Sequence, residues 1–194
     1  MSGIPSQIVL ATTNPGKLAE LAALLAPSLE IRSAPADYAA PEETGRSYLE
    51  NARLKARALY QRTGAAALAD DSGLEVDALG GAPGIRSARF GADVESRTAR
   101  LLAALAGRDR RARFRTALVL VLADGREVGV EGDCEGEIAS EPRGGGGFGY
   151  DPVFLVPSLG RTLAELTSDE KNRVSARAAA ARALLAALAR YAAP

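Results

Sequence analysis

The sequence predicts an α/β fold in a single domain that covers residues 1–194. Short apolar runs typical of buried strands alternate with amphipathic segments that begin at helix-capping residues. Of the 194 residues, 47% are hydrophobic and 25% are charged, which is ordinary for a globular domain with a sizeable core. Three stretches organise the prediction: residues 65–73, residues 12–17 and residues 144–152.

The central stretch is an apolar run, residues 65–69, that leads into Asp70, Asp71, Ser72 and Gly73. The run predicts a buried strand, although its period alone does not exclude a helix fragment. The carboxylates would then stand at the end of the strand, where α/β proteins place their sites. Successive side chains of a strand point to opposite faces, so Asp70 and Asp71 are expected to do different work. The alternative is a loop of solvated acids with an Asx turn before Gly73.

Missing residue types limit the chemistry. The chain has no histidine and a single cysteine, Cys134, so it cannot use Ser-His-Asp or Cys-His catalysis or a histidine metal site. Carboxylates, lysines, arginines, hydroxyls or a bound ion must act instead. An ion held by oxygen ligands alone would be hard, and Mg²⁺ is the first candidate.

Charge and cysteine content indicate where the protein works. The formal net charge is zero, which argues against a general nucleic-acid binder. No apolar run approaches the length of a membrane span, and the N-terminus lacks a signal pattern. One cysteine permits no internal disulfide, so we expect a cytoplasmic protein.

A predicted strand at residues 8–11 leads into a helix whose start can bind an anion. Asn14 is a good N-cap, and Pro15 suits the first helical position. This arrangement directs free backbone N–H groups and Lys17 toward whatever lies above the strand. The alternative is a well-capped turn with an exposed lysine. The pattern is not a P-loop, because the first glycine and the Ser/Thr after the lysine are missing.

Lysine and asparagine are unusually rare, which draws attention to the positions that keep them. Only three of 24 basic residues are lysines, and each has one of the three asparagines within four positions. The lysines are Lys17, Lys55 and Lys171, and the asparagines are Asn14, Asn51 and Asn172. A lysine is a compact point charge suited to phosphate oxygens.

Lys55 falls on the apolar stripe of a helix that a capping box at Ser47 opens and that ends near Thr63. It should point inward toward a ligand, the alternative being a lysine that snorkels from the edge. Further along the chain, Asp124-Gly125 predicts a hairpin between strands at 112–122 and 128–130. A capping box at Thr167 predicts one long helix, with Lys171 and Arg177 in its first turns.

Residues 144–152 form a glycine-rich loop that carries Phe148, Tyr150 and Asp151. Glycines let backbone approach a ligand, and Phe148 offers a face on which a base can stack. The alternative is a mobile surface loop.

Five ordered segments together resemble the inosine/xanthosine triphosphate pyrophosphatase family over nearly the whole chain. They are residues 11–17, residues 43–45 with 50–52 and 55–57, residues 69–90, residues 146–152 and residues 164–171. The resemblance implies a mixed β-sheet flanked by helices, two lobes with a central active-site cleft, and a homodimer. It also implies Mg²⁺-dependent hydrolysis of dITP, ITP or XTP to the monophosphate and pyrophosphate.

The resemblance also implies roles for individual residues. Asp71 matches the family's catalytic acid, and we assign to it the role of orienting or deprotonating the attacking water. Glu43 and Asp71 match the family's metal-binding carboxylates. Positions on the phosphate side are Thr12, Thr13, Asn14, Pro15, Gly16, Lys17, Lys55 and Ser72. Positions on the nucleoside side are Phe148, Gly149, Tyr150, Asp151, Lys171, Ala176 and Arg177. Arg177 is expected to donate to the 6-keto oxygen that distinguishes hypoxanthine and xanthine from adenine.

One departure from the family stands at Ala176, where the family has histidine in the motif Ser-His-Arg. We expect weaker base selection with hydrolysis retained, because the metal and phosphate groups are intact. Two alternatives remain. The first is a related pyrophosphatase with shifted base preference, such as one acting on modified pyrimidines in the manner of the similarly folded septum-inhibitor family. The second is a nucleotide-binding protein whose turnover is impaired by Ala176.

Overall fold

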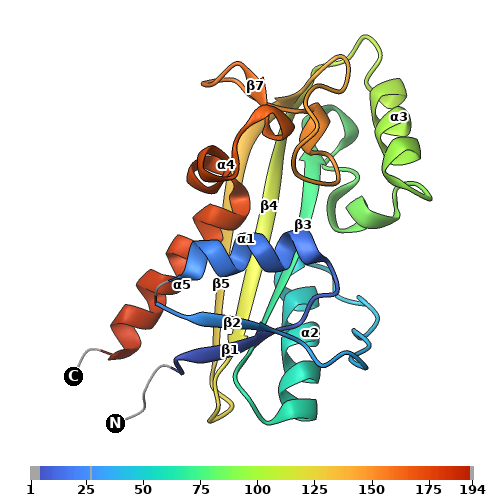
Figure 1. The fold of residues 1–194 in the computed structure, drawn as a ribbon. Coiled ribbons are helices and arrows are strands. Elements are labelled where there is room, and N and C mark those ends of the chain that lie inside the picture. Colours follow the sequence, from blue (N-terminus) through green and yellow to red (C-terminus); the bar gives the residue numbers. More distant parts are fainter. Residues whose placement is uncertain (1–4, 27, 193–194) are drawn as a thin grey trace. The chain divides into compact units, whose positions relative to one another are not determined.

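The computed structural model describes residues 5–26 and 28–192, which form a seven-stranded sheet with helices (Figure 1). The strand order is β2-β1-β3-β4-β5-β6-β7. The strands are β1 (Gln7–Leu10), β2 (Glu30–Ser33), β3 (Ala67–Val76), β4 (Arg111–Val121), β5 (Glu127–Ile138), β6 (Phe154–Val156) and β7 (Arg161–Thr162). The α-helices are α1 (Pro15–Leu25), α2 (Tyr48–Thr63), α3 (Val94–Ala104), α4 (Ser168–Val174) and α5 (Ala176–Ala192). Short 3₁₀ helices are η1 (Asp77–Leu79), η2 (Gly84–Arg89), η3 (Asp151–Val153) and η4 (Leu163–Glu165).

The sheet is mixed, as expected. β1 pairs in parallel with both β2 and β3, whereas β6 is antiparallel to both β5 and β7. The chain divides into two compact units. Unit 1 takes its residues from 1–71, 116–132 and 177–194, and unit 2 takes residues 72–115 and 133–176. The predicted α/β class with a mixed sheet and flanking helices is confirmed.

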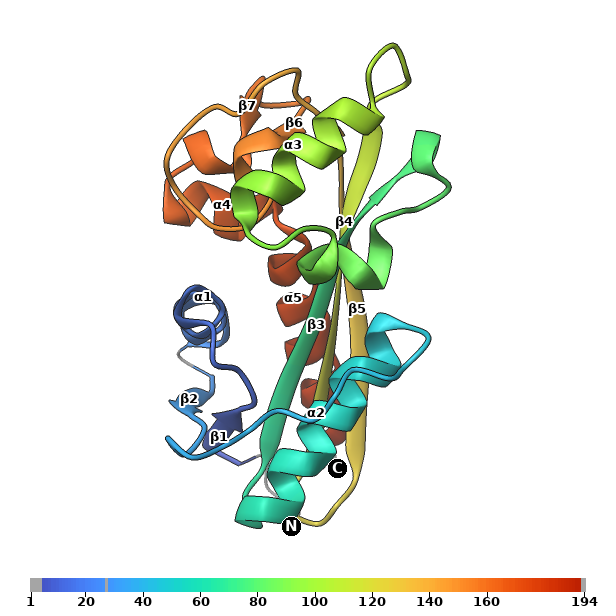
Figure 2. The ribbon, with the colours of Figure 1, turned by 90° about the vertical axis from the view of Figure 1, so that its right-hand side faces the viewer.

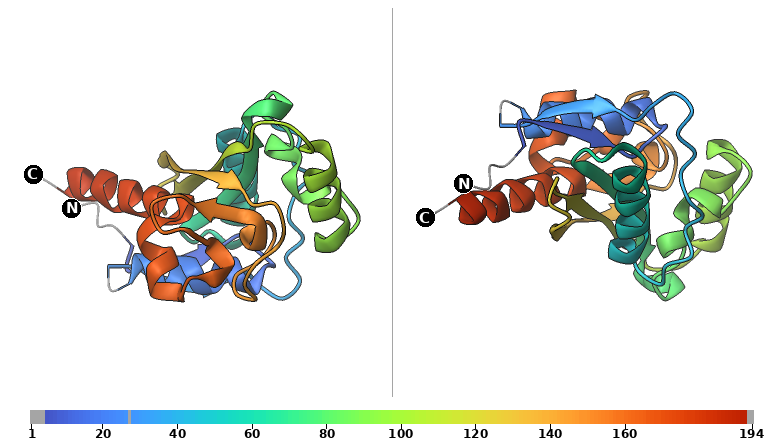
Figure 3. Two further views of the ribbon diagram at one scale, coloured as in Figure 1. Left: turned by 90° about the horizontal axis from the view of Figure 1, so that it is seen from above. Right: turned by 90° about the horizontal axis from the view of Figure 1, so that it is seen from below.

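Unit 1 has its own apolar core, to which β1, α1, β3, β4, β5 and α5 contribute. Its buried side chains include Ile8, Leu10, Leu21, Leu68, Leu118 and Leu184. Each fully buried leucine of this kind contributes about 1.5–3 kcal/mol through the hydrophobic effect. α1 lies beside β1 and β2 (Figure 1), and α2 and α5 lie on opposite sides of the strands (Figure 3).

The predicted start of α1 is confirmed. Asn14 is the N-cap, and its side chain accepts hydrogen bonds from the backbone N–H groups of Gly16 and Lys17 at 2.9 and 3.2 Å. Pro15 occupies the first helical position, where its missing N–H costs nothing. α2 likewise begins after Ser47, whose side chain accepts from the Glu50 N–H, and it ends at Gly64 in the left-handed region with φ 66°.

The acidic stretch is a strand, but its predicted end is wrong. β3 continues through Asp70 and Asp71 to Val76, so the two carboxylates stand in the middle of a ten-residue strand. The continuation is favoured because Leu74 and Val76 are fully buried in unit 2. It is β1 that ends here, since its last pair with β3 joins Leu10 to Leu68. The edge at which strand-end chemistry is expected is therefore the carboxyl end of β1.

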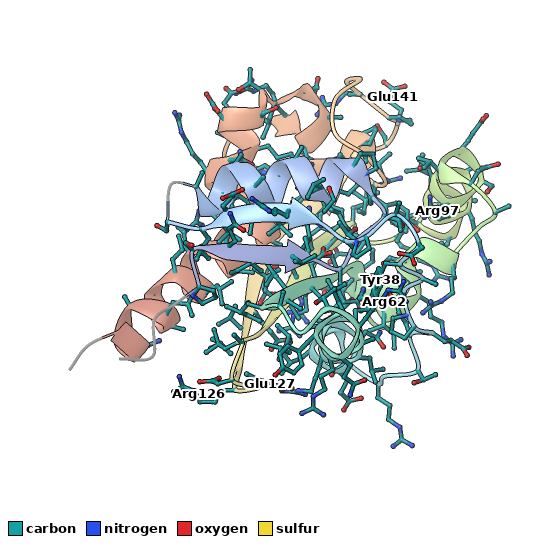
Figure 4. All side chains as sticks on the ribbon, turned by 60° about the horizontal axis from the view of Figure 1, so that its bottom comes forward. Tyr38, Arg62, Arg97, Arg126, Glu127 and Glu141 are labelled. Atoms are coloured by element: carbon teal, nitrogen blue, oxygen red, sulfur yellow. The ribbon has the colours of Figure 1, made fainter. Side chains whose placement is uncertain are left out.

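The predicted hairpin is confirmed. β4 and β5 are joined by a turn at Asp124-Gly125, where Gly125 has φ 82° and donates its N–H to the Leu122 carbonyl. Arg126 and Glu127 mark the turn and the start of β5 in Figure 4. The hairpin gives unit 1 two neighbouring strands of the sheet.

Unit 2 has a second core, built from β3, α3, β4, β5, β6 and η4. Its buried side chains include Leu74, Leu101, Ile138, Tyr150, Val153, Phe154 and Leu163. The rings of Phe114 and Phe154 lie 4.7 Å apart between centroids in a tilted arrangement. Figure 2 shows the orange segment in which β6, β7 and α4 lie together.

The single long helix predicted after Thr167 is wrong. Thr167 and Glu170 form the predicted capping box, but the helix ends at Val174 and a new one begins at Ala176. Ser175 breaks it with extended backbone angles, φ −66° and ψ 154°, while its N–H still donates to the Lys171 carbonyl. The break places Arg177 in the first turn of α5. No helix among residues 5–26 and 28–192 has both the length and the apolar character needed to cross a bilayer.

Candidate active site

The predicted site residues fall into two clusters, each inside one unit. The first cluster, in unit 1, begins with the residues between β1 and α1. Thr12 Oγ1 accepts the Asn14 N–H at 3.1 Å, which shapes the turn. Thr12, Thr13, Asn14 and Pro15 line a pocket of about 260 Å³. The pocket is also lined by a segment in which no sequence pattern predicts a site: Ser33, Ala34, Pro35, Ala36 and Tyr38.

Asp70 is buried between two cations. Its side chain is 1% exposed and lies 3.0 Å from Lys17 Nζ and 3.0 Å from an Arg177 guanidinium nitrogen. The other end of the Arg177 guanidinium forms an ion pair with Glu20, on α1. Burial would raise the pKa of Asp70, but Lys17 and Arg177 hold it well below its ordinary value. Asp70 is thus an anion at neutral pH, and it joins α1 to the start of α5.

Asp71 faces the other side of β3 and contacts α2. Asn51 Nδ2 donates to Asp71 Oδ2 at 3.0 Å, and Lys55 Nζ lies 3.5 Å from Asp71 Oδ1. The same Lys55 ammonium donates to Glu43 Oε1 at 2.8 Å. Lys55 is 7% exposed, so the prediction that it points inward is confirmed. One buried lysine therefore holds two carboxylates from different segments.

The electrostatics of this pair differ from those of Asp70. Burial raises the pKa of Asp71, and Lys55 and the Asn51 hydrogen bond oppose that rise without cancelling it. Burial lowers the pKa of Lys55, but Asp71, Asp70 and Glu43 more than offset this and leave it raised. Asp71 therefore holds a proton more readily than an ordinary aspartate, which suits a group that must accept one.

The oxygen donors in this cluster fit a hard cation that also binds substrate. Glu43 and Asp71 direct carboxylate oxygens at a single positive charge, and Mg²⁺ commonly uses one or two carboxylates together with substrate phosphates. Within the part of the chain that the structure describes, no group of three or more Asp, Glu or Cys side chains could hold a metal.

The second cluster lies in unit 2, on the glycine loop and α4. Lys171 Nζ lies 2.6 Å from Asp151 Oδ2, and both side chains are almost fully buried. Asp151 Oδ2 also accepts the Phe148 N–H at 2.7 Å, which ties the loop to α4. Lys171 Nζ stands 4.7 Å from the centre of the Phe148 ring, a cation–π distance. An aromatic face, an anion and a cation thus lie together.

Four other predicted site residues belong to unit 2: Ser72, Gly149, Tyr150 and Ala176. Tyr150 is buried in the core, where its hydroxyl donates to the Ser87 carbonyl at 3.2 Å and burial raises its pKa to about 12. Gly149 adopts φ 64°, which favours glycine. Ser72 follows Asp71 on β3, and Ala176 is 3% exposed at the start of α5.

Three contacts of the first cluster are not predicted by the sequence. No local pattern points to Glu20, and Asn51 stands out only as a rare asparagine near Lys55. Tyr38 donates its hydroxyl to the Lys55 carbonyl at 3.2 Å and is labelled in Figure 4. Its position in an irregular segment gave no periodicity from which this contact could be inferred.

Comparison with known proteins identifies the family. Residues 8–187 match the model of the Ham1 family. The chain is 54% identical over 185 residues to a dITP/XTP pyrophosphatase of Gloeobacter violaceus, with 94% of each chain covered. It is 50% identical over 188 residues to a dITP/XTP pyrophosphatase of Thermus thermophilus, with 93% of this chain and 91% of the relative covered.

Solved structures agree with these relatives. A HAM1 protein from Coxiella burnetii has a TM-score of 0.83 at 42% identity, covering 96% of this chain and 100% of its own. The Staphylococcus aureus Ham1 protein has a TM-score of 0.84 at 37% identity, covering 95% of this chain and 99% of its own. The resemblance drawn from the five motifs is therefore confirmed, and the chain belongs to the Ham1 family.

Proposed function

We propose that this protein hydrolyses the non-standard purine nucleoside triphosphates dITP, ITP and XTP to the monophosphate and pyrophosphate. The observation that carries the proposal is the buried Asp71 carboxylate, which shares the Lys55 ammonium with Glu43. The similar proteins of Gloeobacter violaceus and Thermus thermophilus bear the name dITP/XTP pyrophosphatase, which supports the same substrates here.

The unit 1 cluster suits a triphosphate. Lys17 and Lys55 are point charges that can neutralise phosphate oxygens, and the turn of residues 12–16 opens α1, whose dipole favours an anion. Phosphoryl transfer depends on positioning and charge neutralisation more than on covalent help from the protein. The two lysines, held by their carboxylate partners, and the capped start of α1 supply both positioning and charge neutralisation.

We assign to Asp71 the role of orienting or deprotonating the attacking water. Its raised pKa makes it a better proton acceptor than an ordinary aspartate, and the Lys55 ammonium lies 3.5 Å from its Oδ1. Asp70 cannot share this role, since Lys17 and Arg177 hold its buried carboxylate as an ion pair. The chain has no histidine to do this work instead.

Mg²⁺ is the cofactor we propose, and Glu43 and Asp71 are the residues that would hold it. When bound, the ion neutralises phosphate charge and polarises the phosphoanhydride. Two carboxylates fit Mg²⁺, which leaves other coordination positions to water and phosphate. Lys55, bonded to both side chains, keeps the pair assembled.

The unit 2 cluster suits the nucleoside. The Phe148 face can stack on a base, and Asp151 with Lys171 offers an acceptor and a donor at fixed positions.

Arg177 remains our assigned donor to the 6-keto oxygen, and its guanidinium is already oriented by Glu20 and Asp70. Loss of the family's histidine at Ala176 would weaken this selection.

We further propose that the enzyme works in the cytoplasm as a homodimer, as the family resemblance implies. The only cysteine, Cys134, is buried, and burial raises the pKa of its thiol to about 11. A buried protonated thiol of this kind is unreactive and agrees with a reducing compartment.

The test is pyrophosphate release from dITP, XTP, ATP, GTP and dTTP with and without Mg²⁺. The proposal expects Mg²⁺-dependent release that is fastest with dITP and XTP. Even turnover of all five would mean that base selection is lost. Binding of dITP without release from any substrate would leave a nucleotide-binding protein.

A further inference from the structure

Asn51 joins the two carboxylate-bearing segments of unit 1, yet no step of the proposed function uses it. Asn51 lies in the first turn of α2 and has 0% of its surface exposed. A buried carboxamide must satisfy both its N–H and its C=O groups. Here Nδ2 donates to Asp71 Oδ2 at 3.0 Å, and Oδ1 accepts the backbone N–H of Gly45 at 2.8 Å.

The contact with Gly45 requires a glycine. A Cβ at this position would stand 2.6 Å from Asn51 Oδ1 and 2.9 Å from the Asn51 backbone nitrogen. Both separations are far below an ordinary van der Waals contact, so any other residue would push the loop away from α2. The absence of a side chain at Gly45 thus lets its N–H reach the carboxamide.

Glu43 reaches the same helix by a second route. Its carboxylate accepts from Lys55 Nζ at 2.8 Å, and Lys55 follows Asn51 by four residues, so both project from one face of α2. The loop of residues 43–45 is therefore attached to α2 at two points, through its Glu43 side chain and through the Gly45 backbone.

The same two helix residues divide the Asp71 carboxylate between them. Oδ2 accepts from Asn51, whereas Oδ1 faces Lys55 at 3.5 Å. Donors on separate oxygens fix the rotation of the carboxylate plane, which a lysine alone could not do. Removing the amide would remove the donor to Asp71 Oδ2 and the acceptor of the Gly45 N–H.

We propose that Asn51 is a positioning residue for the reaction. It orients Asp71 and holds the Glu43 loop against α2, and it does so without touching the substrate. This inference rests on the proposed function, because it assigns Asn51 to the same carboxylates. A misplacement of about 1 Å in such a group can reduce turnover about 10²-fold.

The test compares steady-state kinetics on dITP for three variants and a control. Asn51→Leu removes both hydrogen bonds at similar size. Asn51→Asp keeps an acceptor for Gly45 but replaces the donor to Asp71 with a carboxylate. Gly45→Ala disturbs the contact from the loop side. Gln61→Leu, an exposed amide on the same helix, is the matched control.

The expected result is a fall in kcat of about 10²-fold for Asn51→Leu and Asn51→Asp, with KM within about threefold of wild type. Gly45→Ala should lower kcat in the same way, and Gln61→Leu should match wild type. Thermal unfolding of each variant establishes that the protein assayed is folded. A residue that only stabilises the fold would lower the melting temperature and leave kcat of the folded enzyme unchanged.

Other outcomes overturn the inference. Folded Asn51 variants with wild-type kcat would overturn it, as would a raised KM with kcat unchanged. If Asn51→Leu does not fold, Asn51→Asp and Gly45→Ala decide by the same criterion, and failure of all three to fold would make the contact structural. An inactive wild type would instead overturn the proposed function, and this inference with it, before any variant is compared.

Discussion

Asp70 and Asp71 are neighbours on β3 whose carboxylates meet different helices. Asp70 lies between Lys17 of α1 and Arg177 of α5, whereas Asp71 lies against Asn51 and Lys55 of α2. The alternation of side chains along a strand produces this division. The two side chains therefore have different surroundings, which lead to different expected effects of their substitution.

Replacing Asp70 with Asn should destabilise the protein. The substitution keeps the shape of the side chain but removes the buried anion between Lys17 and Arg177, and breaking such a buried pair costs about 3 kcal/mol although Glu20 still pairs with Arg177. Urea unfolding at pH 7 measures the change. Asp124→Asn is the matched control, because the Asp124–Arg126 pair is exposed at a hairpin turn and contributes little. Equal stability of the two variants would contradict this account.

The contribution of Asp70 should also depend on pH. The pKa of Asp70 in the folded protein lies below its ordinary value of 3.8, so unfolding takes up a proton between the two values. The stabilisation is therefore complete above the ordinary pKa and is lost as the pH falls through the folded-state pKa. Unfolding curves of wild type and Asp70→Asn should converge on acidification, and a constant difference down to the lowest pH would contradict this origin.

Phe148→Ala should weaken nucleotide binding. Stacking of a base on an aromatic ring contributes about 1–3 kcal/mol, so KM for dITP should rise about tenfold or more while kcat changes little. Phe148→Tyr keeps the ring and should retain wild-type KM. Similar KM values for the alanine and tyrosine variants would mean that the base does not stack at this position.

Gly147→Ala should disrupt the same cluster indirectly. A Cβ at Gly147 would stand 2.1 Å from Asp151 Oδ2, and the backbone φ of 68° disfavours alanine as well. Displacing this oxygen breaks its contacts with Lys171 and the Phe148 N–H, so KM for dITP should rise about tenfold. Gly145→Ala, where a Cβ meets nothing within 4 Å, is the control. Equal KM values for the two variants would refute the role given to Asp151.

Ala176→His should sharpen base selection. The added imidazole supplies a polar group at a position adjacent to Arg177, and unmatched polar groups discriminate strongly between bases. We expect the ratio of kcat/KM for dITP over dGTP to rise about tenfold. Ala176 is 3% exposed, so thermal unfolding must accompany the assay to detect overpacking. An unchanged ratio across purines would count against the hypothesis.

The sequence predicts the starts of helices that begin at a capping residue. Asn14-Pro15 and Ser47 placed the starts of α1 and α2, because a helix start requires a polar cap wherever the helix packs. The end of β3 was not predictable in this way. Polar residues such as Asp70 usually end a buried strand, and only the burial of Leu74 and Val76 in the second unit explains why this strand continues.

The sequence predicts site residues that stand out by their residue type, but it does not predict which side chains pair with one another. The rare lysines each lie at a carboxylate: Lys17 at Asp70, Lys55 at Glu43, and Lys171 at Asp151. Sequence alone does not show that Glu20 binds Arg177 across 157 positions of chain, or that Asn51 binds Asp71. Such contacts depend on which elements pack together, and no local pattern encodes them.

The most direct test of the central claim is pyrophosphate release from dITP with Mg²⁺ by wild type and by Asp71→Asn. Asp71→Asn keeps the size of the side chain and removes the proton acceptor. The account predicts that wild type turns over dITP and that the variant loses about 10²- to 10⁴-fold in kcat while still binding dITP. An Asp71→Asn enzyme with wild-type turnover would contradict it.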